Sequence, residues 1–74
     1  MKVMISMDGM RITVSDRFLD GKGGKKACIM IRKSSKIIGT GFVLSNGGFD
    51  PGDIPAELVD QVVCLLKENC PQLF

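Results

Sequence analysis

The chain has 74 residues, a net charge of +2 and a hydrophobic content of 45%. This length is that of one small domain spanning residues 1–74, and the apolar content excludes an intrinsically disordered chain. The sequence contains no histidine, which is the commonest general base and the commonest metal ligand, so we expect a protein that is not an enzyme and has neither a metal site nor a cofactor.

The beginning of the chain predicts a β-hairpin. Apolar residues alternate with more polar ones on both sides of Asp8-Gly9, a dipeptide typical of the type I′ turns that join paired strands. A two-residue turn pairs strands at about 2–7 and 10–15 so that one face carries only apolar side chains. These core-facing residues are Val3, Ile5, Met7, Met10, Ile12 and Val14.

A second hairpin follows a connection that is rich in glycine and lysine. Its strands are expected at about 26–33 and 36–45, with Ser34-Ser35 in the turn. Pairing of Ile31 with Ile38 would continue the core face along the last strand through Thr40, Phe42 and Leu44. The residues of that strand on the other face would then be Ile37, Gly39, Gly41 and Val43.

One helix is expected at about 55–69, because apolar residues recur there at helical spacing. Pro55 suits the first turn, Asp53 is a candidate N-cap, and Pro71 ends the helix. The sequence therefore predicts an α+β fold, in which a four-stranded antiparallel meander of two hairpins packs one face against a C-terminal helix. The apolar side of that helix is formed by Leu58, Val59, Val62, Val63, Leu65 and Leu66.

The cysteines and the apolar runs bear on the cellular compartment. Three cysteines, an odd number, do not complete a set of disulfides, and no secretory signal is recognisable. No apolar run approaches the length of about 18 residues that a membrane span needs. We therefore expect a cytoplasmic protein that does not contact a membrane.

Charged residues are sorted along the chain. Six cations and no carboxylate lie between Gly21 and Phe49, whereas five carboxylates and a single lysine follow that segment. A β-ribbon with several cations can follow a phosphate backbone, and such binding weakens steeply with salt. The alternative is a solvated basic edge that deters aggregation. The predicted contacts to nucleic acid or to another anionic partner are Lys22, Lys25, Lys26, Arg32, Lys33 and Lys36.

The sheet face away from the helix is a second candidate surface. Its expected side chains are rather apolar for a solvated face, and such patches are typical of contacts with another copy or another protein. Cys64 does not belong to this face, but it is added to the candidate interface residues because it falls on the polar side of the helix. The alternative is that the aliphatic stems of Lys2, Arg11 and Arg32 cover the face. The candidate interface residues are Met4, Met30, Ile37, Val43 and Cys64.

Strand-like segments at 10–15, 29–32 and 41–45, followed by a helix from Pro55, also suggest a family. In this order of elements the chain resembles the positive-cofactor-four family of transcriptional coactivators. The resemblance covers about two-thirds of the chain and implies basic ribbons that bind single-stranded DNA and a helix that joins two subunits. The loop at 46–53 and the small number of aromatic residues depart from the family pattern.

These features lead to two hypotheses of different kinds. The first is a small non-enzymatic nucleic-acid-binding domain that favours single strands, uses the basic loop and hairpin, and forms a homodimer. The second is a protein-binding module, such as a phage or mobile-element product that inhibits or adapts a host complex by gripping an acidic protein surface. Binding to oligonucleotides at low salt would test the first hypothesis, and a pull-down from nuclease-treated lysate would separate the two.

Overall fold

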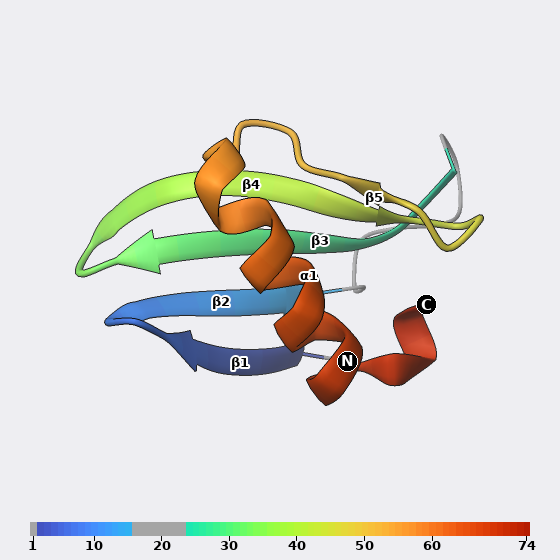
Figure 1. Ribbon diagram of the computed structural model, residues 1–74, viewed down its shortest axis with the longest axis horizontal. Helices are drawn as coiled ribbons and strands as arrows, with labels where there is room; N and C mark the ends of the chain where they lie inside the picture. The colour runs from blue at the N-terminus through green and yellow to red at the C-terminus, as the bar shows by residue number, and fades with distance from the viewer. Residues whose placement is uncertain (1, 16–23) are drawn as a thin grey trace.

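The computed structural model describes residues 2–15 and 24–74, which form one antiparallel sheet with a helix across one of its faces (Figure 1). The strands lie in the sheet in chain order, so that β1 and β5 are its edges. The α+β class and the C-terminal helix are confirmed, but the sheet has five strands rather than four. The elements are β1 (Lys2–Met7), β2 (Met10–Ser15), β3 (Lys25–Lys33), β4 (Lys36–Leu44), β5 (Phe49–Asp50), α1 (Ala56–Asn69) and the 3-10 segment η2 (Pro71–Leu73).

The first hairpin forms as its sequence predicts. β1 and β2 have the expected bounds, with Ile5 opposite Ile12 and Lys2 opposite Ser15. Asp8 and Gly9 occupy the turn with φ values of 48° and 77°, the left-handed conformation that a type I′ turn needs at both central positions. The alternation of apolar residues and the turn dipeptide agree with each other here, and together they determine the register.

The second hairpin has a register that differs from the prediction. Ile31 lies opposite Gly39 rather than Ile38, because an irregularity between Ile31 and Arg32 leaves Ile38 without an opposite residue. An extra residue of this kind is a β-bulge, and it reverses the side to which every later residue of the strand points. β3 also begins one residue earlier than predicted, and β4 ends one residue earlier.

The shifted register exchanges the two faces of β4. Val43 is fully buried in the core, whereas Phe42 is half-buried on the opposite face. The prediction that Thr40, Phe42 and Leu44 face the core is therefore wrong. Gly39, Gly41 and Val43, which were predicted to point outward, are on the core side instead, whereas Ile37 points outward as predicted.

The segment between β5 and α1 crosses the core side of β4 where that strand has glycines. A Cβ atom on Gly39 would lie 2.7 Å from Ile54 Cα, and one on Gly41 would lie 2.8 Å from Ile54 Cδ1. Ile54 is itself buried and belongs to the core cluster. The two glycines thus leave room for Ile54, which supplies the apolar volume that β4 does not.

Asp53 fastens the same segment to β4 and does not cap the helix. α1 begins at Ala56, with Pro55 in the N-cap position and no capping side chain, so the predicted N-cap is wrong. Asp53 Oδ1 accepts a hydrogen bond of 2.7 Å from the Thr40 N–H, and the Asp53 N–H donates to the Thr40 carbonyl at 3.3 Å. These bonds give hydrogen-bond partners to the backbone groups of β4 that the two-residue strand β5 does not reach.

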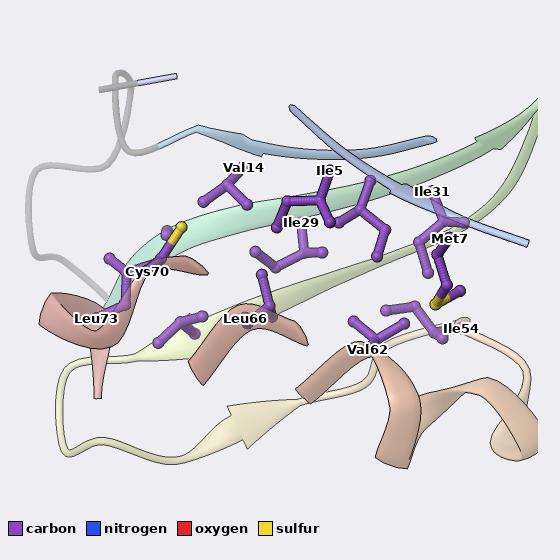
Figure 2. Close-up of a cluster of buried hydrophobic side chains, with 13 residues drawn as sticks. Ile5, Met7, Val14, Ile29, Ile31, Ile54, Val62, Leu66, Cys70 and Leu73 are labelled. Carbon is purple, nitrogen blue, oxygen red and sulfur yellow. The ribbon is translucent and has the colours of Figure 1, made fainter. Parts of the chain in front are cut away.

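The helix completes the core through one apolar stripe. Val62 and Leu66 are fully buried, and Cys70 extends the core past the end of the helix. Figure 2 shows Val62 with Ile54 and Met7 at one end of this cluster and Cys70 at the other. Further helical residues pack at its margin, namely Leu58, Val59 and Leu65.

Candidate nucleic-acid interface

The cations predicted to contact an anionic partner form two groups. Arg32 and Lys33 end β3 and Lys36 begins β4, so these three flank the turn between the strands. Lys25 and Lys26 begin β3 and lie about 23 Å away, at about 3.3 Å per residue along a strand. The described cations of the basic stretch therefore do not form one continuous patch.

Arg11 joins the group at the turn, although the sequence suggested it only as a possible cover for the sheet face away from the helix. Pairing of β2 with β3 places Arg11 directly opposite Arg32, and Lys33 lies opposite Lys36. All four side chains are exposed, and within the described part of the chain no carboxylate is ion-paired with any of them. We call these four residues the turn-end cluster. Arg11 and Arg32 lie on the sheet face opposite α1, whereas Lys33, opposite the core-facing Met10, and its partner Lys36 lie on the other face. The cluster lies where the β1–β2 and β3–β4 turns meet at one end of the sheet (Figure 1).

The opposite end of β3 pairs a cation with an aromatic ring. Lys25 Nζ lies 4.1 Å from the centroid of the Phe42 ring, which is within the range of a cation–π contact. Lys26 is turned elsewhere, because its Nζ donates to the Gln72 carbonyl at 3.4 Å. Lys22 lies outside the described residues. Of the two described lysines at this end of β3, Lys25 therefore lies beside Phe42 and Lys26 does not.

We call the sheet face opposite α1 the outer face, and it carries part of the candidate interface. Met4 is 61% exposed and Ile37 is 53% exposed, and Met30 is half-buried between them in sheet order. Val43 is 0% exposed, so its predicted place on this face is wrong. The cause is the bulge that reverses the faces of β4.

Cys64 lies on α1 and so does not join the outer face. The thiol is exposed, and its Sγ lies 4.0 Å from the Glu68 carboxylate one helical turn away. Cys64 is therefore an accessible thiol on the acidic side of the protein.

Brief treatment of the folded protein with iodoacetamide is expected to modify Cys64 before the other two cysteines. Cys28 and Cys70 are buried, and burial raises the pKa of both thiols, an effect that the charge of Lys25 partly offsets at Cys28. The thiolate is the reacting species, so raised pKa values and burial both slow the reaction. Mass spectrometry of proteolytic peptides would measure the order, and early modification of Cys28 or Cys70 would contradict it.

Acidic side chains gather on the side of the helix. Glu57, Asp60 and Glu68 of α1 are exposed, and α1 covers the sheet face opposite the outer face (Figure 1). Asp8 lies in the β1–β2 turn, but its Oδ2 accepts a hydrogen bond of 3.1 Å from Gln61 Nε2 on the helix. The sorting of charge along the sequence is thus partly kept in space, because α1 carries Glu57, Asp60 and Glu68, whereas most described cations lie on the sheet and its turns.

The described residues hold neither a candidate metal site nor a helix that could cross a membrane. Within residues 2–15 and 24–74, no group of three or more cysteine or acidic side chains is placed to hold a metal ion. No helix in the same residues is long and apolar enough to cross a membrane. Comparisons with protein-family models, with curated proteins and with solved structures gave no match. The coactivator resemblance therefore stays a prediction from the sequence.

Proposed function

We propose that this protein is a small non-enzymatic nucleic-acid-binding domain whose outer face and turn-end cluster contact the sugar–phosphate backbone. The observation that carries the proposal is the cluster itself, in which Arg11 faces Arg32 and Lys33 faces Lys36 without a partner carboxylate among the described residues. Like charges directly opposite each other destabilise a sheet. A polyanion bound there would remove this repulsion and gain charge-assisted hydrogen bonds.

The shape of the outer face favours single strands over a duplex. The face spans four long strands at about 4.8 Å spacing, which is wider than the major groove of about 12 Å that admits a helix or a two-stranded ribbon. A single strand can instead lie across the sheet with its bases against side chains. Phe42 offers a ring for stacking, and Lys25 beside it supplies a positive charge.

Fluorescence anisotropy with labelled single-stranded oligonucleotides at low salt, about 50 mM, tests the proposal. We expect Lys36→Gln to weaken binding and to lower the dependence of log K on log salt by about 0.7, the value for one lost phosphate contact on a single strand. Lys67→Gln is the matched control, because it makes the same change in the last turn of α1, outside the turn-end cluster. Absence of binding, or equal losses in the two variants, would overturn the proposal.

Homodimerisation and protein binding stay predictions beside this one. The exposed side chains of Met4 and Ile37 are compatible with either partner. A pull-down from nuclease-treated lysate separates protein binding, the rival function, from nucleic-acid binding. Retention of a protein partner, together with no oligonucleotide binding at low salt, would favour the protein-binding module.

A further inference from the structure

A hollow of about 440 Å³ opens at the turn end of the sheet. It is formed by both turns and by three strands, and no acidic residue lines it. Its position coincides with half of the turn-end cluster, so it belongs to the surface proposed above. The lining residues are Ser6, Gly9, Met10, Arg11, Arg32 and Ser34.

The strand register explains why these polar side chains meet. Ser6 lies opposite Arg11 in β1 and β2, and Arg11 lies opposite Arg32 in β2 and β3. The three residues therefore form one row across three strands. Ser34 joins them from the β3–β4 turn, where its φ of 57° gives the tight reversal that brings the turn against this row. The hollow thus has two guanidinium groups and two hydroxyl groups as hydrogen-bond donors.

The charges in the hollow specify the ligand further. Two arginines are permanently charged, and no described carboxylate is ion-paired with either of them. Guanidinium groups bind phosphate oxygens through pairs of parallel hydrogen bonds, with more specificity than an ammonium group provides. A phosphate monoester carries a charge of about −1.5 to −2 at neutral pH, which matches two arginines, whereas an internal phosphodiester of a nucleic acid carries a single negative charge.

We propose that the hollow between Arg11 and Arg32 binds a phosphate monoester, and that this group is the terminal phosphate of a bound nucleic-acid strand. The place of the hollow supports this assignment, because it lies at the end of the outer face and not at its centre. A strand lying across the sheet towards Phe42 would have its end there. The identity of the strand rests on the proposed function, whereas the affinity of the hollow for a phosphate monoester does not.

The experiment compares three single-stranded oligonucleotides of one sequence, carrying a 5′-phosphate, a 3′-phosphate or no terminal phosphate. A fourth, one nucleotide longer and without a terminal phosphate, controls for added charge. We expect one terminal phosphate to tighten binding by about tenfold, as for hydrogen bonds to a charged group. Arg11→Gln and Arg32→Gln should each abolish most of this advantage, and Lys67→Gln should retain it. Circular dichroism would establish that each variant is folded.

A second measurement tests the hollow without a nucleic acid. Inorganic phosphate, titrated against chloride of equal ionic strength, should shift the ¹H–¹⁵N resonances of Arg11, Arg32 and Ser34. Equal binding of all oligonucleotides would overturn the terminal-phosphate assignment and leave the proposed function intact. Phosphate-induced shifts without oligonucleotide binding would overturn the proposed function and keep the monoester site. If a free mononucleotide competed for the hollow more tightly than the phosphorylated strand, the bound phosphate would not come from a strand end. The absence of any phosphate-induced shift would overturn the site itself.

Discussion

Replacement of Gly39 by alanine is expected to lower the free energy of unfolding by about 3 kcal/mol, the upper end of the range for overpacking a core. The added Cβ would lie 2.7 Å from Ile54 Cα and 2.9 Å from the Asp53 carbonyl oxygen. Both neighbours are backbone atoms, so a change of side-chain rotamer cannot relieve the contact. The segment that carries Asp53 and Ile54 would have to move away from β4.

Such a movement would affect more than one interaction. It would draw Ile54 out of the core and strain the bonds between Asp53 and Thr40. A loss of this size lowers the midpoint of thermal unfolding by about 12–24 °C in a domain of this length. Thermal and urea unfolding followed by circular dichroism would measure it.

Gly48→Ala provides the matched control for this prediction. The nearest atom to its added Cβ is Asn46 Oδ1 at 3.0 Å, the end of an exposed side chain that can move at the cost of the 2.8 Å hydrogen bond it accepts from the Gly48 N–H. We expect a loss of less than about 1 kcal/mol, as for most surface substitutions. If Gly39→Ala were as stable as Gly48→Ala, the close crossing of β4 by Ile54 would be wrong.

The first hairpin and the helix could be predicted from sequence because several local signals agree there. Asp8-Gly9 sets the turn, the alternation sets the faces, and Pro71 follows the end of the helix closely. The second hairpin has no such agreement. Ser34-Ser35 is a weak turn signal, and a bulge such as the one at Ile38 has no sequence pattern that determines it.

The glycines of β4 show how tertiary structure overrides a local interpretation. Gly39 and Gly41 weaken a strand when they are considered alone. In the fold they are needed because the segment after β5 crosses the strand at close range. Nothing in the local sequence indicates that Ile54, beyond a loop, would fill the space above them. The role of Asp53 was missed for the same reason, since its partner Thr40 is distant in the sequence.

The candidate site was predicted in its charge but not in its arrangement. The basic stretch drew attention to Arg32, Lys33 and Lys36, which the structure places around one turn. Arg11 was missed, although the first hairpin already placed it on the face away from the core. Its importance depends on the pairing of β2 with β3, and no turn motif in the intervening connection determines that register. Charge counted along a chain therefore underestimates a cluster that strand pairing assembles.

Two single substitutions, Val43→Thr and Thr40→Val, test the corrected register of β4. Val43→Thr is expected to lower the free energy of unfolding by about 1–3 kcal/mol, because it introduces a buried hydroxyl group without a hydrogen-bond partner. Val43 is 0% exposed, and the side chains around it are apolar. The two residues have nearly the same shape, so the loss would reflect polarity and not a cavity.

Thr40→Val makes the reverse change on the outer face and is the matched control. Thr40 is half-buried there, and only its backbone groups bond to Asp53, so we expect a change of less than about 0.5 kcal/mol. The register inferred from sequence requires the opposite pattern, with Thr40 in the core and Val43 outside. Stabilisation by Thr40→Val together with a neutral Val43→Thr would therefore restore that register. Such a result would return Phe42 to the core and remove the aromatic ring on which the outer face depends for stacking.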